Sequence, residues 1–328
     1  MAAKSVHGVE RVRSKLDACI KSGNYYEAHQ MYRTLYFRYL SQQKYSALLE
    51  LLCDGAFLLL EHNQQSSGAD LAILYVEVLV KSNTKAGEAQ FSTLANLFQM
   101  ISAEVPERET FLANALRWSL TGSEVDKTGQ IGHPQLHQMI AEIFWKEKNY
   151  VLARYHYLHS TDGHGCAAML VELHNLKGYP SEVDLFIAQA VLQYLCLQNK
   201  KTAAVAFSSY TTQHPNIKAG PPYLLPLLNF IWFLLKAIES GKLAVFRVLC
   251  ERYKPIIKRD PTYSEYLDRI AQIFFGVPPP PPKKQNVFGN LFQSFGNLFN
   301  DMNDSDSDEG TPSTSTTSTH RMETEDVD

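Results

Sequence analysis

The sequence has few cysteines, no long uninterrupted hydrophobic run and almost no strand-like alternation of apolar and polar residues. Its five cysteines are odd in number and lie far apart in apolar helical patterns, which favours reduced thiols over a disulfide framework. The most apolar stretch, Leu224 to Leu235, contains Pro226 and Asn229 and falls short of the roughly 18 to 20 residues that cross a bilayer. Residues 1–8 lack the apolar core of a secretory signal. We therefore expect a protein of the cytosol or nucleus that does not insert into membranes.

Motifs of nucleotide-binding and hydrolytic enzymes are also missing: the chain has no G-x-x-x-x-G-K-[ST], G-x-G-x-x-G, H-E-x-x-H or G-x-S-x-G. Asp126-Lys-Thr-Gly129 resembles the phosphorylated tetrapeptide of ion pumps, but the match ends at Gln130 and such a pump requires transmembrane helices. No pair of carboxylates stands in an apolar context that would raise a pKa for acid-base work. We therefore expect no catalytic activity and no cofactor, because an enzyme would need a site assembled from distant loops.

Two groups of residues carry metal-ligating side chains. They are His156, His159, His164 and Cys166 in one group and His133 and His137 in the other. Neither group has a C-x-x-C partner or a third ligand at the spacing of a zinc site. We interpret the first group as a partly buried helix end followed by a turn. The second is interpreted as a helix start with Pro134 at the first helical position, so we expect no metal.

The formal net charge of −3 is unevenly distributed. Residues Asp301 to Asp328 hold nine acidic residues and one basic residue, so this segment carries −8 and the rest of the chain +5. The segment cannot bury enough apolar area to fold, and we predict that it is disordered, with Ser305 and Ser307 as candidate phosphorylation sites. The mildly basic remainder lacks dense clusters of Lys and Arg, which favours protein partners with acidic patches over nucleic acid.

From residue 9 to residue 275 the sequence has the periodicity of amphipathic helices. Val9, Val12, Leu16 and Cys19 follow a 3-4-3 spacing that forms one apolar stripe. Polar breaks, many with Gly or Pro, recur at short intervals and leave room for about fourteen helices joined by short loops. The main breaks are residues 21–24, 64–68, 81–87, 105–106, 122–132, 161–165, 178–180, 214–222 and 259–261.

An internal repeat supports stacked helix pairs. Asn24 to Tyr32 and Asn149 to Tyr157 share the pattern N-Y-x-x-A-x-x-x-Y, and Asn199 to Phe207 keeps the Asn, the Ala and an aromatic residue. We interpret the Ala as the point where a neighbouring helix backbone approaches, and the aromatic residue as the filling between pairs, as in tetratricopeptide-like hairpins. The copies are irregularly spaced. We therefore predict an all-α protein, a degenerate right-handed α-solenoid of tetratricopeptide-like helix pairs.

The folded part is expected to end near Gly276. Pro278 to Pro282 favours a polyproline II spacer, and the sequence Phe-Gly-Asn-Leu-Phe then occurs twice, at residues 288–292 and 295–299. We predict five segments. They are a flexible N-terminus (1–8), the two halves of the solenoid (9–150 and 151–276), a Pro-rich linker with the repeated pentapeptide (277–300) and the acidic tail (301–328).

Two surfaces have compositions that suggest contact with partners. His7, Arg11 and Lys15 recur every four residues off the apolar stripe of the first helix, although an ordinary solvated face has the same pattern. The second surface is the Pro- and Gly-rich loop 214–222 with the apolar helix 223–235 that follows it. Such a helix must be covered on most sides, either by its own neighbours or by a partner segment in a groove.

Four blocks carry a resemblance to a known family. They are Val9-Glu-Arg-Val-Arg-Ser-Lys-Leu16, the Tyr-rich block Gly23 to Tyr39, the run Leu48-Leu-Glu-Leu-Leu-Cys-Asp-Gly-Ala56 and the polyproline after Phe275-Gly276. Over roughly residues 9 to 276 the sequence closely resembles the Golgi-to-ER traffic protein four family, whose animal members are subunits of the transmembrane-domain recognition complex. The resemblance implies a non-catalytic α-solenoid adaptor of the cytosol that helps deliver tail-anchored membrane proteins to the endoplasmic reticulum.

The resemblance also implies partners for the two halves. In the family, N-terminal helices bind a dimeric targeting ATPase through basic residues, which assigns Arg11, Arg13 and Lys15 to that contact. The C-terminal half holds a ubiquitin-like adaptor in fungi and, in animals, the large Bag-six chaperone scaffold, whose nuclear localisation signal it covers. The fungal site includes a small hairpin, where this sequence has only the loop 214–222. The candidate contacts here are Tyr210, Tyr223, Leu225, Phe230 and Phe233.

The expected action is multivalent bridging, in which one rod holds the ATPase and the client-loaded scaffold and raises the effective concentration for handover. The repeated Phe-Gly-Asn-Leu-Phe matches no family motif, and it could pack back on the solenoid or act as a docking peptide. The alternative function is a solenoid subunit of another large assembly, such as a proteasome-lid-like or vesicle-coat scaffold. Strands after residue 240 would favour that alternative.

Overall fold

The computed structural model describes residues 2–121 and 131–279, with side chains from Arg11 onwards. All regular secondary structure in these residues is helical, including the part after residue 240, so the predicted all-α fold is confirmed. The Asp126 tetrapeptide, the repeated Phe-Gly-Asn-Leu-Phe, Ser305 and Ser307 lie outside the described residues. Of the helices that are described, none is both long enough and apolar enough to span a bilayer.

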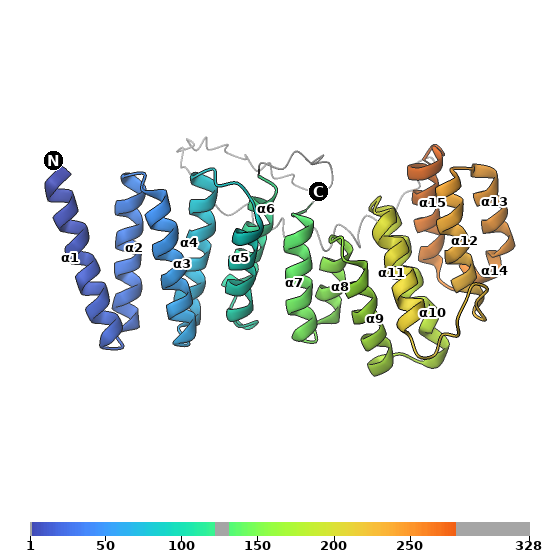
Figure 1. Ribbon diagram of the computed structural model, residues 1–328, viewed down its shortest axis with the longest axis horizontal. Helices are drawn as coiled ribbons and strands as arrows, with labels where there is room; N and C mark the ends of the chain where they lie inside the picture. Colours follow the sequence, from blue (N-terminus) through green and yellow to red (C-terminus); the bar gives the residue numbers. More distant parts are fainter. Residues whose placement is uncertain (1, 122–130, 280–328) are drawn as a thin grey trace, which may run out of the picture. The chain divides into compact units, whose positions relative to one another are not determined.

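Fifteen α-helices and one short 3-10 helix follow one another along the described residues, against about fourteen helices predicted (Figure 1). They are α1 (Ala2–Lys21), α2 (Tyr25–Ser41), α3 (Tyr45–Glu61), α4 (Gln65–Lys81), α5 (Glu88–Met100), α6 (Glu107–Ser119), α7 (Pro134–Lys146), α8 (Tyr150–Leu158), α9 (Gly163–Lys177), η1 (Pro180–Glu182), α10 (Val183–Cys196), α11 (Lys200–Gln213), α12 (Pro226–Ser240), α13 (Leu243–Arg252), α14 (Lys254–Ile257) and α15 (Pro261–Phe275).

Helices pack mainly on helices that are near them in the chain. Pairs such as α3 with α4 and α7 with α8 are joined by short turns, and α9 packs on α11 across α10. In Figure 1 the helices stand in one row that begins at α1 and ends at α13 and α14, with α15 packed back on α10. Each pair therefore contacts the pairs beside it, and the apolar core runs along the row, which is the solenoid arrangement. The right-handed twist of the row stays a prediction.

Six turns between helices share one three-residue conformation. The middle residue has a left-handed backbone, and the N–H of the third residue donates to the carbonyl five residues earlier, at 2.8–3.1 Å, as in a Schellman C-cap. The middle residues are Gly23, Gln43, Asn63, Asn83, Lys148 and Gln198, with φ between 49° and 72°. Five of the six are not glycine, so these helices end without the residue that usually marks such a turn.

The repeated N-Y-x-x-A-x-x-x-Y pattern starts at such turns. At three of them the third residue is an Asn whose side-chain oxygen accepts from the backbone N–H three residues on, at 3.3–3.4 Å, and so caps the next helix. The Ala and the aromatic residue of each copy are buried, as the interpretation of the repeat requires. These residues are Ala28 and Tyr32, Ala153 and Tyr157, and Ala203 and Phe207.

Two predicted breaks are placed differently by the structure. Residues 66–68 lie inside α4, and Gly165 lies inside α9. Gly68 is buried where α3 and α4 meet, and a Cβ atom there would lie 2.6 Å from Cγ of Leu60. This glycine therefore permits a close approach of two helices and does not mark a loop.

Arg108 connects the helices on either side of residues 122–130. It lies buried on α6, where its Nη1 donates to Oε2 of Glu147 at 3.3 Å and its Nη2 donates to Oε1 of the same carboxylate. Glu147 is the C-cap residue of α7. The guanidinium also lies 4.1 Å from the ring centroid of Phe98 and 5.7 Å from that of Phe144. One paired cation thus ties α5 and α6 to α7.

Candidate interaction surfaces

The candidate ATPase contacts lie on α1, beside a buried stripe that packs on α2. Arg11, Arg13 and Lys15 are exposed, while Val12 and Leu16 are buried. Because an α-helix turns about 100° per residue, Arg11 and Lys15 lie within roughly 40° of each other, whereas Arg13 projects from almost the opposite side. The structure therefore brings Arg11 and Lys15 into one basic stripe and separates Arg13 from it. His7 precedes the first described side chain.

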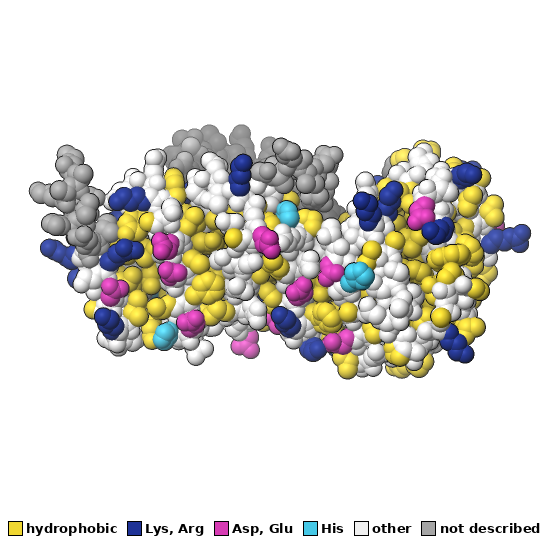
Figure 2. All heavy atoms as spheres, in the orientation of Figure 1, with side chains coloured by type: hydrophobic (Ala, Val, Ile, Leu, Met, Phe, Trp, Pro, Cys, Tyr) yellow, Lys and Arg dark blue, Asp and Glu magenta, His cyan; other side chains and the backbone are white. Residues whose placement is uncertain are grey.

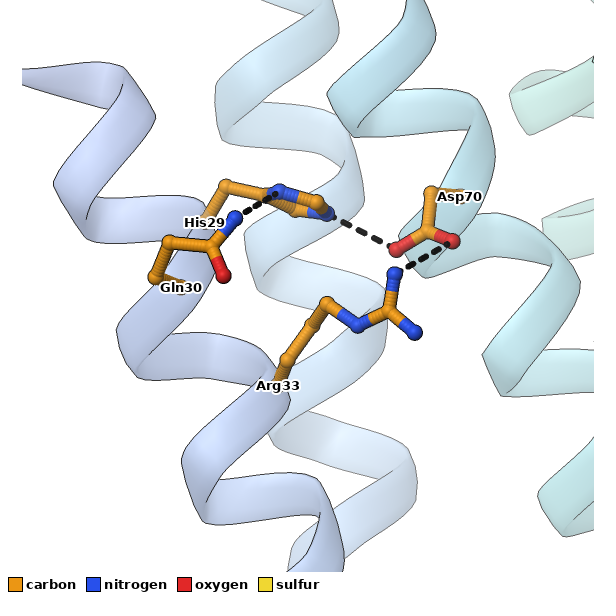
Figure 3. Close-up of polar contacts among 4 residues, drawn as sticks. All are labelled: His29, Gln30, Arg33 and Asp70. Carbon is orange, nitrogen blue, oxygen red and sulfur yellow. Dashed lines mark hydrogen bonds and ion pairs between the residues drawn. The ribbon is translucent and has the colours of Figure 1, made fainter.

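A polar cluster ties α2 to α4 further along the row (Figure 3). Nε2 of His29 lies 2.7 Å from Oδ2 of Asp70, and Nη1 of Arg33 donates to Oδ1 at 3.4 Å. The side-chain amide of Gln30 donates to Nδ1 of His29 at 3.4 Å, so the ring proton is on Nε2 and is donated to Asp70. The His–Asp pair resembles part of a catalytic triad, in which the second ring nitrogen faces a nucleophile. Here that nitrogen is Nδ1 of His29, and it accepts the hydrogen bond from Gln30 instead. The cluster therefore serves to join two helices.

The loop 214–222 is anchored by two buried histidines that bond in series. Nε2 of His174 lies 2.9 Å from the carbonyl of Tyr179, which can only accept, so Nδ1 of His174 accepts from Nε2–H of His214 at 2.9 Å. Nδ1 of His214 in turn accepts from the N–H of Asn216 at 3.1 Å. Burial, reinforced by His174, lowers the pKa of His214 to about 4. The loop is thus held by a series of hydrogen bonds through two imidazole rings.

The segment after this loop is held by Asn229 of α12. Its Oδ1 accepts from the N–H of Tyr223 at 2.8 Å, and its Nδ2 donates to the carbonyl of Tyr223 at 2.7 Å. The hydroxyl of Tyr223 donates to Oγ1 of Thr211 at 3.4 Å. The sequence analysis predicts that the helix begins at residue 223. In the structure α12 begins at Pro226, so residues 223–225 precede the helix and that part of the prediction is wrong.

The predicted scaffold contacts divide by burial. Tyr210 and Phe230 are fully buried, and the hydroxyl of Tyr210 donates to the carbonyl of Val183 at 2.8 Å, so both side chains belong to the packing between helices. Tyr223 and Leu225 are partly exposed and Phe233 is 43% exposed. Of the five candidates, only these last three have side chains that reach the surface, and their contact with a partner stays a prediction.

Leu224 belongs to the same surface although the sequence analysis does not single it out. Its side chain is 76% exposed, more than any other large apolar side chain in the described residues. The clamp by Asn229 on the neighbouring residue explains why Leu224 cannot turn inward. Apart from Phe233, most apolar residues of α12 are covered by α10, α11, α13 and α14, so most of this helix is core.

The histidines considered as metal ligands form no common site. His137 and His156 are fully buried with their Nδ1 atoms 2.9 Å apart, and the His159 ring lies 5.2 Å from that of His137. His164 is on a different helix, where it bonds to Ser209 at 2.6 Å. In residues 2–121 and 131–279, no group of three or more His, Cys, Asp or Glu is placed to hold a metal ion.

The second predicted histidine group behaves as a helix start. His133 is the N-cap residue of α7 and Pro134 occupies the first turn, as interpreted from the sequence. The ring of His133 accepts from the N–H of Gln135 at 3.2 Å. His137, one turn later, points into the core beside His156.

His159 lines a hollow of about 260 Å³ that also contains Ser160. The hydroxyl of Ser160 donates to the carbonyl of Tyr157 at 2.8 Å and accepts from the N–H of Asp162 at 3.1 Å. Its hydrogen bonds therefore stabilise the turn between α8 and α9, and they do not join it to His159 as a nucleophile to a base.

The buried histidines predict a loss of stability in acid. Burial lowers the pKa of His156 to about 3 and that of His159 to about 4, and the pKa of His137 lies well below its ordinary value. The unfolded chain, in which these pKa values return to about 6.5, binds more protons below that pH, so the free energy of unfolding falls as the pH drops. His156 and His159 are each expected to contribute about 1 to 2 kcal/mol of loss between pH 7 and pH 5, and His137 acts in the same direction.

This dependence is measured by urea unfolding at several pH values. Replacing His159→Phe removes one titrating group and is expected to flatten the dependence between pH 7 and pH 5. The matched control is Val151→Phe, which places the same ring at an exposed position and removes no titrating group, so it is expected to leave the slope unchanged. Equal slopes in the protein and in His159→Phe would show that this ring does not titrate differently on unfolding.

Known proteins match nearly the whole chain. A family model described as Golgi to ER traffic protein 4 matches residues 42–295. The chain is 54% identical to the Golgi to ER traffic protein 4 homolog of Xenopus tropicalis over 308 residues, which are 94% of this chain and 91% of the relative. It is 52% identical to the homolog of Homo sapiens over 309 residues, with the same coverage. A solved structure described as a crystal structure of C. therm. Get4 has a TM-score of 0.75 at 25% identity and covers 88% of this chain and 95% of that one.

Proposed function

The chain belongs to the Golgi to ER traffic protein 4 family, and from this premise we propose that it is a non-catalytic adaptor in the post-translational delivery of tail-anchored membrane proteins to the endoplasmic reticulum. It works in the cytosol. It bridges the dimeric targeting ATPase to the Bag-six chaperone scaffold and the ubiquitin-like adaptor, and it retains the scaffold in the cytosol by covering its nuclear localisation signal.

The observation that carries this proposal is the separation of two different surfaces along one row of packed helices. The first helix, α1, exposes the basic pair Arg11 and Lys15, and the loop before α12 exposes Leu224. A basic surface suits an acidic partner, whereas an apolar surface held by hydrogen bonds suits a partner segment that buries apolar area. Two surfaces that do not overlap allow both partners to bind at once, which is what handover by effective concentration requires.

The buried polar groups support a role without catalysis. The pair His137–His156 lies fully inside the core, where no substrate reaches it. The pair His174–His214 uses its ring nitrogens to hold a loop. Asp184, a buried carboxylate, is paired with Arg259 at 3.2 Å. Each group has a structural task, so the proposed function is binding.

The test is a charge reversal on α1. The double replacement Arg11→Glu with Lys15→Glu turns the basic stripe acidic and is expected to abolish capture of the targeting ATPase in a pull-down while capture of the Bag-six scaffold continues. Because both side chains are exposed and off the buried stripe, the fold is expected to survive, which the helical circular dichroism spectrum checks. Association measured by stopped flow is expected to slow steeply with added salt in the unaltered protein.

The matched control reverses the same charge elsewhere. Lys44→Glu with Lys85→Glu changes two exposed lysines in the turn before α3 and in the loop before α5, and it is expected to leave ATPase capture intact. If the α1 variant captured the ATPase as well as the control does, the assignment of the α1 surface would be wrong. If the unaltered protein captured neither the ATPase nor the scaffold, the proposed bridging function itself would be wrong.

A further inference from the structure

The outer face of α13 is apolar where a solenoid end is ordinarily polar. The helix buries Phe246 and Leu249 against its neighbours α12 and α14. On its other side Val245 is 47% exposed and Val248 is 61% exposed, one helical turn apart. Terminal repeats of solenoids usually present a polar outer surface to water, so two exposed valines on one ridge suggest that something covers them.

The same face is basic. Residues 200–276 contain eleven Lys and Arg against five Asp and Glu, and Figure 2 shows basic side chains outnumbering acidic ones over the helices α11 to α15. Arg252 is exposed one turn beyond Val248 on the same side of α13, and Lys242 is exposed at the start of the helix, and neither forms an ion pair with a described carboxylate. Glu251, the one acidic residue of α13, is paired with Lys254 at 3.2 Å. An occupant of this face therefore has apolar and acidic groups.

The chain leaves the described structure beside this helix. The ring of Phe275, the last residue of α15, lies 4.8 Å from the ring of Phe246 on α13, and the N–H of Val277 still bonds to the carbonyl of Ala271 at 3.2 Å. Phe288 lies nine residues beyond Pro279 in the chain, which allows a reach of about 28 Å in extended polyproline geometry. A helix with its side chains is about 10 Å across, so the following residues reach α13 easily.

The sequence that follows contains both kinds of group that this face calls for, first apolar residues and then acidic ones. Phe-Gly-Asn-Leu-Phe occurs at residues 288–292 and 295–299, and residues 301–309 then contain five acidic side chains. We propose that residues 288–309 dock on the outer face of α13 of the same chain, with the Phe and Leu side chains on the Val245–Val248 ridge and the acidic residues on the surrounding cations. This contact goes beyond the proposed function and does not depend on it.

The tether makes such a contact effective even if it is weak. A short linker holds the segment at an effective concentration in the millimolar range, so a modest intrinsic affinity is enough to keep the face covered. Phosphorylation of Ser305 or Ser307 would add about 1.5 to 2 negative charges each at neutral pH and would tighten the contact with the cations. The proposed contact thereby covers the Val245–Val248 ridge of α13.

The test is zero-length carbodiimide cross-linking of the full chain, with mass spectrometry of the linked peptides. Amide links are expected between Lys242 or Lys254 and the acidic residues 301–309. An equimolar mixture of nitrogen-15-labelled and unlabelled chains separates links within one chain from links between two chains, and links within one chain are expected. Links mainly between chains would identify a second copy as the occupant and overturn the proposal.

The variant Val248→Asp with Arg252→Glu makes the face polar and acidic and is expected to lower the yield of these links at least five-fold. The matched control is Val151→Asp on α8, where the valine is 65% exposed, and it is expected to leave the yield unchanged. All three replaced side chains are exposed, and a retained helical circular dichroism spectrum confirms folding. An unchanged yield in the α13 variant, or links of residues 301–309 spread equally to Lys85 and Lys200, would overturn the proposal.

Discussion

Replacing Glu147→Ala is expected to lower the free energy of unfolding by about 3 kcal/mol, because it leaves the buried guanidinium of Arg108 without its carboxylate. Arg108 is enclosed by the rings of Phe98 and Phe144, and both terminal nitrogens bond to this one side chain. The loss is measured by urea unfolding. Because the ion pair joins α6 to the end of α7, the replacement is expected to weaken the packing of these two helices and to accelerate protease cleavage between them.

The second half of the experiment removes both charges. Arg108→Leu with Glu147→Leu replaces the ion pair by apolar groups and is expected to recover most of the lost stability, since no unpaired charge stays buried. An exposed pair provides the comparison: Glu239→Ala breaks the contact with Lys236 on α12 and is expected to cost less than about 0.5 kcal/mol. Equal losses for Glu147→Ala and Glu239→Ala would mean that the buried pair is not what holds the junction.

Replacing Gly163→Ala is expected to cost about 3 kcal/mol through a direct clash between helices. A Cβ atom at this position would lie 2.8 Å from the backbone nitrogen of Ala206 and 2.8 Å from the carbonyl oxygen of Thr202, both on α11. Backbone atoms cannot turn aside as a flexible side chain can, so α9 would have to move away from α11. The change in urea midpoint measures the cost.

The control for this replacement is Gly87→Ala at the start of α5. There the added Cβ atom meets only the end of the Gln90 side chain, at 3.2 Å, and φ is −159°, which any residue adopts. The expected change is within about 0.5 kcal/mol. A cost for Gly163→Ala no larger than that for Gly87→Ala would show that α9 and α11 separate without penalty.

Helical periodicity was enough to predict the fold class, because nearly every helix has one buried stripe that the sequence displays directly. The boundaries were less accessible. The turns at Gln43, Lys148 and Gln198 contain neither Gly nor Pro, and only the Asn that begins the repeated pattern, at positions 149 and 199, indicates two of them. Gly68 gives the opposite error, a break predicted where the helix continues. It allows close packing inside α4, and the local sequence does not distinguish that use of glycine from a turn.

The exposure of a candidate residue could be predicted where it depends only on the spacing of residues along one helix. Arg11 and Lys15 lie off the apolar stripe of α1, so their exposure follows from spacing. In α12 the sequence is apolar almost all round, and only the positions of α10, α13 and α14 decide that Phe230 is buried and Phe233 is not. The pairing of His174 with His214, forty residues apart, likewise depends on tertiary structure.

The shared turn conformation has a consequence for how this chain tolerates change. One tripeptide ends six helices through backbone hydrogen bonds, and at five of these turns the next helix begins directly after it. Its middle position is Gly, Asn, Gln or Lys. Because backbone groups make the hydrogen bond that all six turns share, that bond does not depend on the side chain at the middle position. The outward residues of these helices are then free to diverge, and one scaffold can acquire unlike surfaces at different positions without redesign of its framework.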